Sequence, residues 1–229
     1  MGFVIDGCSI LIGGLIGALF KKKIDIKNNT SISIAIMLIS IVGLLENILT
    51  TDDGKVIGEH TVVVTIALVI GCAIGDKLRL EDRIFSLSES NNELRKGLIN
   101  SIFFFGIGGL QISGPIVYVL NGDSFQLILK GIIDFPFALM LGATYGIIVC
   151  LSSFAVVLIQ ILIAAGAYFL GNFMSENLIC QLCSLGYLVL FFSGFNMICN
   201  PKYKIKNTNI LPGVLLIILY NIIVEVFQI

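Results

Sequence analysis

The sequence predicts an all-α, polytopic membrane protein, a bundle of about eight transmembrane helices. Of its 229 residues, 57% are hydrophobic and only 13% are charged, and the mean hydropathy is +1.01. The apolar residues form long continuous runs, and in hydrocarbon only helices and closed barrels satisfy every backbone polar group. The longest hydrophilic stretch, 76–97, is too short for a soluble domain. We therefore predict a single transmembrane domain over residues 1–229.

Eight segments contain the roughly 20 mostly apolar residues that a spanning helix needs. They are 3–20, 31–50, 60–78, 98–120, 128–150, 152–171, 179–199 and 209–228. Only Ser152 and Ser153 separate the fifth segment from the sixth, so the prediction assumes a tight turn there.

The basic residues support this number of spans, because cytoplasmic loops concentrate Lys and Arg. With the N-terminus outside, the three inner loops hold four, five and three of the 14 basic residues, and only Lys55 and Lys130 remain outside. Eight spans then leave both the N- and the C-terminus outside.

The inner stretch 78–88 has apolar residues close to one helical stripe, with charged residues between them. This pattern is typical of an amphipathic helix on the cytoplasmic face. A solvated linker is the alternative interpretation.

The first three predicted spans resemble the last three at an offset of about 150 residues, with Asn47 aligned to Asn196. The offset corresponds to five spans, an odd number, so the two halves would be inverted in the membrane. Many secondary transporters have this arrangement.

The fourth and fifth spans contain residues that weaken a helix. In the fourth span these are the Gly-Ile-Gly-Gly run 106–109, then Gly114 and Pro115, and Pro115 leaves the carbonyl of Gln111 without its intrahelical donor. In the fifth span, Pro136 frees a carbonyl beside Asp134. Broken spans next to a membrane carboxylate are the best sequence indication of an ion or substrate site.

Asp134 is a carboxylate at membrane depth, roughly 9 Å below the outer boundary at ~1.5 Å per residue. A charge there costs a few kcal/mol unless it faces a cavity, is protonated or is paired. Lys130 lies one helical turn earlier on the same face. Two interpretations stay open: an ion pair that anchors the helix, or a carboxylate that binds a cation or proton.

Four uncharged polar residues lie at span depth: Asn47, Gln160, Asn196 and Asn221. Interhelical hydrogen bonds of ~1 kcal/mol explain most such residues. Gln160 is the most central, so it is the preferred candidate for a transport pathway. Three carboxylates lie toward outer span ends: Asp6, Glu46 and Glu225. For these, solvation at the interface is favoured over an acidic entrance for cations.

No constellation of soluble-enzyme residues is present. The sequence has no glycine-rich phosphate loop followed by Lys, no Ser-His-Asp set around His60 and no HExxH motif. Cys180 and Cys183 have the spacing of a metal or redox pair, but no second pair accompanies them, so inert packing is expected. We predict no enzyme activity, catalytic residue, cofactor, metal site or nucleic-acid partner.

Four stretches, in their order along the chain, resemble a known family. They are GGLIGALF near the start, IGDKLRLEDRI after the third span, LILKGIID at the beginning of the fifth and NILPGVLL at the beginning of the last. Over essentially its whole length the chain resembles the bacterial family named domain of unknown function 554, the YdfK/YqgA-type membrane proteins. The resemblance implies a multi-pass protein of the bacterial plasma (inner) membrane, and it matches Lys130 and Asp134 to a pair in the family's fifth span. Gly213 departs from the alanine expected after the proline.

The first functional hypothesis is a small secondary transporter or channel for a cation, a proton or a small solute. Its site would be Asp134 with Lys130, Gln111, Gly114, Pro115, Pro136, Gln160, Asn47 and Asn196. The alternative is a membrane scaffold or sensor that does not transport and acts through the segment 78–88. Expected partners are the lipid bilayer, the ion or solute, and a second copy in a homodimer.

Overall fold

The computed structural model describes residues 1–20, 30–52, 55–58, 60–86, 93–106, 109–169, 171 and 175–227. Over these residues the chain is helical, apart from a short antiparallel hairpin of β1 (Thr50–Asp52) and β2 (Lys55–Ile57). The predicted helical class is confirmed. The chain divides into two compact units, Met1–Asn29 with Arg83–Tyr168 and Thr30–Asp82 with Phe169–Ile229.

The first unit contains five α-helices and a 3-10 helix among its described residues. They are α1 (Gly2–Leu19), α5 (Glu93–Gly106), α6 (Gly109–Asn121), α7 (Phe125–Tyr145), the 3-10 helix η2 (Ile147–Leu151) and α8 (Ser152–Phe169).

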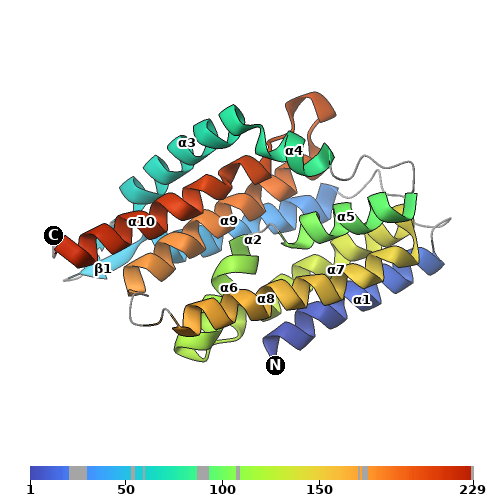
Figure 1. Ribbon diagram of the computed structural model, residues 1–229, viewed down its shortest axis with the longest axis horizontal. Helices are drawn as coiled ribbons and strands as arrows, with labels where there is room; N and C mark the ends of the chain where they lie inside the picture. Colours follow the sequence, from blue (N-terminus) through green and yellow to red (C-terminus); the bar gives the residue numbers. More distant parts are fainter. Residues whose placement is uncertain are drawn as a thin grey trace. The chain divides into compact units, whose positions relative to one another are not determined.

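α1 and α7 lie side by side and run in the same direction (Figure 1). A Cβ at Gly2 would meet the Leu127 side chain, and a Cβ at Gly13 would come within 2.6 Å of the Phe135 carbonyl oxygen and 3.0 Å of the Ala138 Cβ. Glycines therefore allow the two backbones to approach closely, as small residues do in membrane helix pairs.

The turn between the predicted fifth and sixth spans lies earlier than expected. The chain turns at Gly146, with φ 82°, a conformation that glycine adopts without steric cost. Ser152 and Ser153 instead begin α8, where their hydroxyls donate to the carbonyls of Val149 and Cys150 at 2.6 and 2.8 Å.

The predicted interruption of the fourth span is observed at its glycine run, whereas the fifth span is not interrupted. The segment predicted as the fourth span consists of two helices, α5 and α6, inclined by 52°. Pro115 lies inside α6, and Pro136 lies inside the uninterrupted α7. A proline removes one donor, but the rest of each helix keeps its backbone bonds, so neither proline ends its helix.

The second unit consists of antiparallel helix pairs. Its described helices are α2 (Thr30–Ile48), α3 (Thr61–Leu78), the start of α4 (Leu80–Ser86), α9 (Glu176–Ile198), the 3-10 helices η4 (Pro201–Tyr203) and η5 (Asn207–Ile210), and α10 (Leu211–Phe227). Gly43 of α2 faces Tyr187, and Gly194 of α9 faces Met37, so α2 and α9 are antiparallel.

α3 and α10 also run side by side in opposite directions (Figure 1). Gly71 lies against Gly213, and Gly75 lies against Asn209. α4 falls within the predicted amphipathic segment 78–88, whose last two residues are outside the described part of the chain.

Polar contacts tie the end of α3 and the start of α4 to η5. The Asn209 amide donates to Asp76 Oδ1 at 2.5 Å and accepts from the backbone N–H of Glu81 at 2.9 Å. The Glu81 carboxylate accepts from the backbone N–H of Thr208 at 3.1 Å. Arg79, with φ 50°, makes the turn between the helices.

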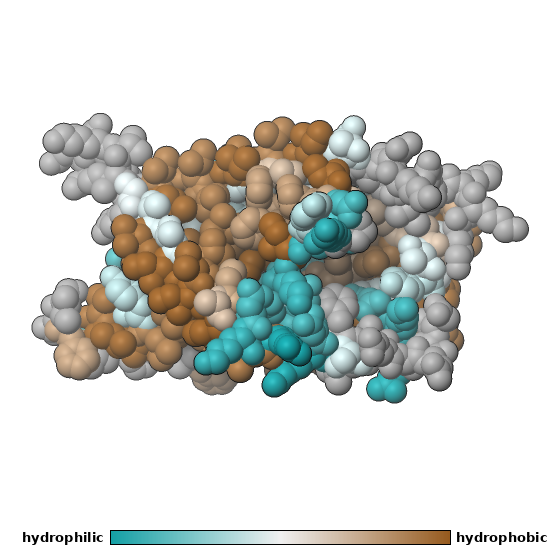
Figure 2. Space-filling view, turned by 90° about the horizontal axis from the view of Figure 1, so that it is seen from above, coloured by the Kyte–Doolittle hydropathy of each residue, from teal (hydrophilic) through white to brown (hydrophobic). Residues whose placement is uncertain are grey.

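The surface identifies the chain as a membrane protein. Six described helices are long and apolar enough to cross a bilayer, or seven spans if the bent α5–α6 pair counts as one, while the apolar helix Ser33–Ile48 is shorter. Hydrophobic residues cover much of the described surface on the face shown in Figure 2. Val62 and Val69 of α3 and Leu162 of α8 are each more than 60% exposed, as expected for side chains that face lipid.

Candidate functional site

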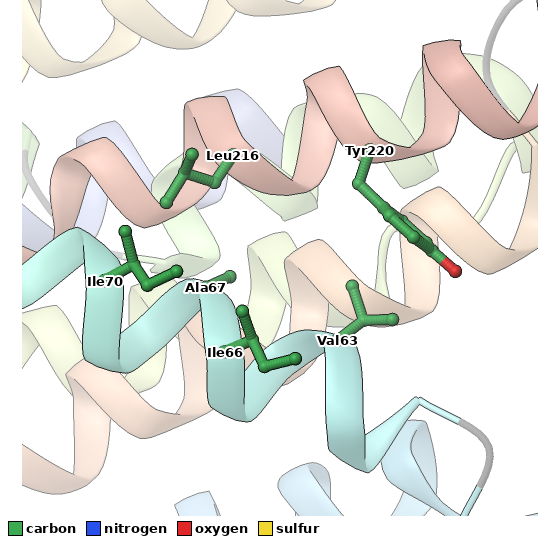
Figure 3. Close-up of a pocket in the computed structure, with 6 residues that line it drawn as sticks. All are labelled: Val63, Ile66, Ala67, Ile70, Leu216 and Tyr220. Carbon is green, nitrogen blue, oxygen red and sulfur yellow. The ribbon is translucent and has the colours of Figure 1, made fainter.

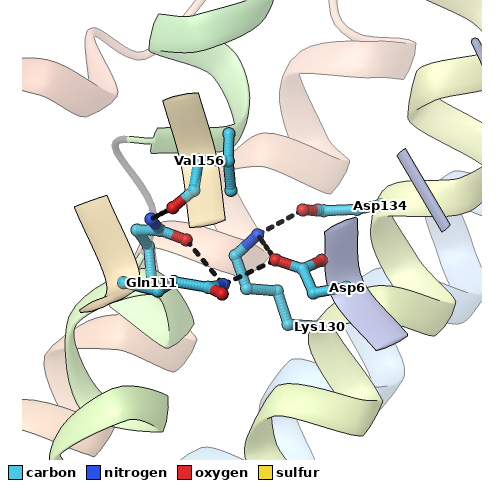
Figure 4. Close-up of polar contacts among 6 residues, drawn as sticks. Asp6, Gln111, Lys130, Asp134 and Val156 are labelled. Atoms are coloured by element: carbon cyan, nitrogen blue, oxygen red, sulfur yellow. Dashed lines mark hydrogen bonds and ion pairs between the residues drawn. The ribbon is translucent and has the colours of Figure 1, made fainter. Parts of the chain in front are cut away.

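Three charged side chains meet inside the first unit. The Lys130 ammonium lies 2.8 Å from Asp6 Oδ2 and also donates to Asp134 Oδ2 (Figure 4). All three residues are buried, with 0% of Asp6, 4% of Lys130 and 7% of Asp134 exposed. We call these three residues, together with Gln111 and Gln160, the polar cluster.

Two glutamines extend the cluster through the unit. The Gln160 amide donates to Asp6 Oδ2 at 2.6 Å and to Gln111 Oε1 at 3.1 Å. Gln111 in turn donates to the backbone carbonyl of Val156 at 3.1 Å (Figure 4). Both glutamines are fully buried. The hydrogen bonds therefore connect α6 and α8 to the ion pairs between α1 and α7.

The close contact of α1 and α7 brings the charges together. A Cβ at Gly131 would lie 3.2 Å from the Asp6 Cα, a tighter contact than most side chains make, so glycine favours the close approach of the α1 backbone to the residue after Lys130. Gly2, Asp6 and Gly13 recur at the spacing of one helical face, and all three are buried. Asp6 consequently lies on the side of α1 that packs against α7.

Two oxygens of the cluster have no hydrogen-bond partner within the described part of the chain. They are Asp6 Oδ1 and Gln160 Oε1, both on fully buried side chains. An unpaired buried acceptor costs about 1–3 kcal/mol, and more when it is charged. Carboxylate and amide oxygens are ligands of hard cations, and a carboxylate can also take up a proton.

The cluster has more negative than positive groups. Asp6 and Asp134 face one ammonium, that of Lys130, so the three ionised side chains carry one excess negative charge. A buried unpaired charge is costly in the membrane. The arrangement is chemically suited to taking up one proton or cation.

Four of the predicted site residues meet in this cluster: Gln111, Lys130, Asp134 and Gln160. Gly114 and Pro115 lie in α6, where a Cβ at Gly114 would contact the Leu127 side chain at 3.0 Å, so the glycine permits packing on α7. Pro136 lies in α7, half a turn beyond Asp134.

Asn47 and Asn196 are in the other compact unit. The Asn47 amide donates to the Gly43 carbonyl of its own helix at 2.7 Å. Asn196 donates to the carbonyl of Ile205 and accepts from its N–H, both at 2.8 Å, and thereby holds the loop after α9. These contacts give both residues structural partners within the second unit.

Sequence reasoning missed Asp6. It favoured solvation of Asp6 at the outer interface, whereas the structure buries this carboxylate against Lys130 and Gln160. Glu46 and Glu225, grouped with it, are exposed. The signal that could have distinguished Asp6 is its place on the glycine-rich face of the first span, because that face packs against another helix.

The second unit has a smaller polar group without charged residues. Gln181 Nε2 lies 3.4 Å from His60 Nδ1, and the Asn221 amide donates to Gln181 Oε1 at 2.8 Å. These contacts link α9 with α10 and the start of α3. They agree with interhelical hydrogen bonding as the explanation for Asn221.

A groove between α3 and α10 is apolar and contributes no ion ligand. It has a volume of about 180 Å³ and is lined by Val63, Ile66, Ala67, Ile70, Leu216 and Tyr220 (Figure 3). Across the residues that the structure describes, no group of three or more His, Cys, Asp or Glu side chains could hold a metal ion.

Comparison with known proteins agrees with the predicted family. The chain is 27% identical over 219 residues to the uncharacterized membrane protein YdfK of Bacillus subtilis, covering 94% of this chain and 93% of YdfK. It is 24% identical over 230 residues to the uncharacterized protein YqgA of Escherichia coli, covering 94% of each. No solved structure matches the chain. The family model described as protein of unknown function (DUF554) matches residues 1–222, and the chain therefore belongs to that family.

Proposed function

We propose that the protein is a small secondary transporter or channel for a monovalent cation or proton, in the bacterial inner membrane, with its site at the polar cluster. The observation that carries this proposal is the burial of two carboxyl groups, Asp6 and Asp134, against a single ammonium, Lys130, inside a membrane protein. Ionisable groups within spans are rare, costly and usually part of an ion or proton path.

The cluster differs from a simple structural ion pair. A structural pair needs one carboxylate for one ammonium, and Lys130 with Asp134 alone would provide it. The second carboxylate, Asp6, makes the group anionic, and its Oδ1 has no partner among the described residues. A stable protein gains nothing from this excess charge, so an exchangeable cation or proton is the simplest reason for it.

Helix directions support eight spans. Because α3 and α10 are antiparallel, the chain must cross the membrane an odd number of times from the start of α3 to the start of α10. α3, α7, α8 and α9 provide four crossings, so the bent α5–α6 pair would provide the fifth.

The same reasoning applies to the first helices. α1 and α7 are parallel, so an even number of crossings must precede α7. α1, α3 and the α5–α6 pair provide three, so α2 would provide the fourth despite its short apolar run. With α7, α8, α9 and α10 the total is eight, and the distribution of Lys and Arg favours both termini outside.

Antiparallel contacts also support the inverted repeat. The repeat relates α1 to α8, α2 to α9 and α3 to α10. α2 with α9 and α3 with α10 are antiparallel neighbours, and α1 meets α8 antiparallel where Gly7 faces Val157 and Asp6 accepts from Gln160. A two-fold axis in the membrane plane produces such pairs, as in many secondary transporters.

Ion flux into proteoliposomes tests the proposed function. The wild-type protein is compared with Asp134→Asn, with gradients of Na⁺, K⁺ and H⁺ applied in turn. Asp123→Asn serves as the control, because Asp123 is an exposed carboxylate just before α7 and the variant has the same change in charge.

The expected result is flux in the wild type and in Asp123→Asn, and a loss of at least tenfold in a folded Asp134→Asn protein. If no ion moves faster than in empty liposomes, the transport proposal is wrong. The non-transporting scaffold or sensor would then be the better hypothesis.

A further inference from the structure

We infer that the polar cluster holds one monovalent cation at a time and that the protein is an obligatory one-for-one exchanger of monovalent cations, H⁺ among them. The inference rests on the proposed function and adds two properties to it: the charge of the cargo and the rule that couples inward to outward movement.

The charge of the cargo follows from the composition of the cluster. When all three groups are ionised, Asp6 and Asp134 contribute two negative charges and Lys130 one positive charge, on side chains that are at most 10% exposed. One monovalent cation makes this group neutral. A divalent cation would leave it with a net positive charge, which is as costly in hydrocarbon as the negative one.

The two carboxylates have different hydrogen-bond partners. Asp6 Oδ2 accepts from both Lys130 and Gln160, at 2.8 and 2.6 Å. Asp134 accepts from Lys130 within the cluster. The donors around Asp6 therefore keep its carboxylate ionised. Asp134 is the carboxylate to which a transported cation can bind in place of Lys130.

This difference defines a loaded state. When a cation binds Asp134, the Lys130 ammonium stays with Asp6 and the whole group is neutral. Asp6 Oδ1 has no hydrogen-bond partner among the described residues and is available as a second ligand. It is bonded to the same carbon as the oxygen that accepts from Lys130. Lys130 lies within reach of both carboxylates, so it pairs with both again when the cation leaves.

The coupling rule follows from the charge of the empty state. A loaded, neutral cluster can pass through the low-dielectric centre of the protein, whereas an empty cluster carries one negative charge. Scales of membrane insertion give a cost for one charge at mid-bilayer that would make the charged, empty cluster there about a hundredfold less populated than the neutral, loaded one. The empty carrier therefore does not return, and a cation leaves one side only when another is carried back.

The test compares two kinds of uptake by the full-length protein in proteoliposomes. Labelled Na⁺ or Rb⁺ is added outside vesicles that contain either the same unlabelled ion or a large impermeant cation at fixed pH. A membrane potential, negative inside, is then imposed with an inward gradient of the permeant anion thiocyanate, which adds no exchangeable cation. A trapped pH-sensitive dye follows H⁺ exchange.

The expected result is uptake at least tenfold faster against an internal monovalent cation than against the impermeant one, with no change when the potential is imposed. Labelled Ca²⁺ should not exchange. Uptake into vesicles without an internal exchange partner, driven by the potential, would overturn the exchanger while leaving the transport proposal intact. Flux of no ion at all would remove both.

Variants give a second measurement on the same vesicles. Asp134→Asn makes the empty cluster neutral and should abolish exchange, whereas Lys130→Arg keeps the count of charges, so its exchange should remain independent of potential. Asp123→Asn should behave like the wild type. Exchange by Lys130→Arg that becomes dependent on potential would contradict the charge argument.

Discussion

The Lys130 ammonium is shared by two carboxylates, and the stability of the protein should depend on them unequally. Asp6 accepts from two buried donors, whereas Asp134 accepts from Lys130 alone within the cluster. Hydrogen bonds to charged groups contribute about 1.5–3 kcal/mol and those to neutral groups about 0.5–1.5. Asp6→Asn should therefore lower the free energy of unfolding by about 1–2 kcal/mol more than Asp134→Asn does.

Thermal unfolding of the purified variants measures this difference. Lys130→Met should be the least stable variant, by about 3–5 kcal/mol, because it leaves two buried carboxylates without a counter-ion. Asp123→Asn, at an exposed position, should match the wild type. Equal losses for Asp6→Asn and Asp134→Asn would mean that Gln160 does not stabilise the Asp6 carboxylate.

Glu81, which lies outside the predicted spans, should make the stability of the protein depend on pH. Burial at the α4–η5 contact raises the pKa of its carboxyl above the ordinary value near 4.5, although the hydrogen bond from Thr208 and the charge of Lys206 oppose the shift. A raised pKa means that the folded protein binds the proton more tightly than the unfolded chain. Its contribution to stability is therefore largest below pH 4.5 and is lost as the pH rises through the raised pKa.

Glu81→Gln removes this titration and keeps an oxygen that accepts from the Thr208 N–H. The melting temperature of Glu81→Gln relative to the wild type should rise between about pH 4 and pH 7. If the wild type instead gains stability over Glu81→Gln with rising pH, the hydrogen bond from Thr208 outweighs the burial of the carboxylate.

The site residues that were easiest to predict are those that lie close together in the sequence. Lys130 and Asp134 are one helical turn apart, so their contact follows from helix geometry. Gln160 drew attention because it is polar in mid-span, and it does join the cluster. Asp6 is 124 residues from Lys130. Its place on the glycine-rich face of the first span indicates burial, but nothing in the sequence identifies Lys130 as its partner.

At the scale of the elements, glycines determine how closely α1 and α7 pack. A methyl group at Gly17 would overlap the carbonyl oxygen of Leu139 and lie 2.9 Å from the Ala143 backbone nitrogen. Gly17→Ala should therefore push the helices apart at a cost of about 1–3 kcal/mol or more. Because the same contact holds Asp6 near Lys130, ion flux should fall as well.

Gly166→Ala is the matched control within the same unit. A Cβ at Gly166 would have no heavy atom within 4 Å, and the residue lies inside α8. Alanine is favoured over glycine in a helix by about 1 kcal/mol, so this variant should be slightly more stable than the wild type in the same melting experiment. A Gly17→Ala protein as stable as Gly166→Ala would show that α1 and α7 tolerate separation.

The elements themselves were easier to predict than their interruptions. Long apolar runs defined the helices, because a membrane span has few alternatives to continuous backbone bonding. The prolines at 115 and 136 were wrong guides to the breaks, since both lie inside helices. The chain turns at Gly146 and bends between α5 and α6, in a glycine-rich run. Glycine, which lowers the cost of unusual backbone angles, was the better signal here.

At the scale of the whole molecule, eight crossings require both ends of the chain on the same side of the membrane. A chain in which α2 or the α5–α6 pair did not cross would have its two ends on opposite sides. Fusions to alkaline phosphatase, which is active only in the oxidising periplasm, and to green fluorescent protein, which fluoresces in the cytoplasm, distinguish these topologies. Joined after α10, the phosphatase should be active and the fluorescent protein dark, and an N-terminal epitope should be accessible from outside.

An epitope inserted at Lys204, in the loop between α9 and α10, provides the internal comparison, because it should become accessible only after the membrane is opened. The basic residues of this loop favour the cytoplasm, and eight spans require it there. Accessible epitopes at both Lys204 and the N-terminus would exclude eight spans. They would also break the inverted relation of α1–α3 to α8–α10, because the equivalent helices could no longer cross in opposite directions. The exchanger would then lose the symmetry by which one cluster faces each side in turn.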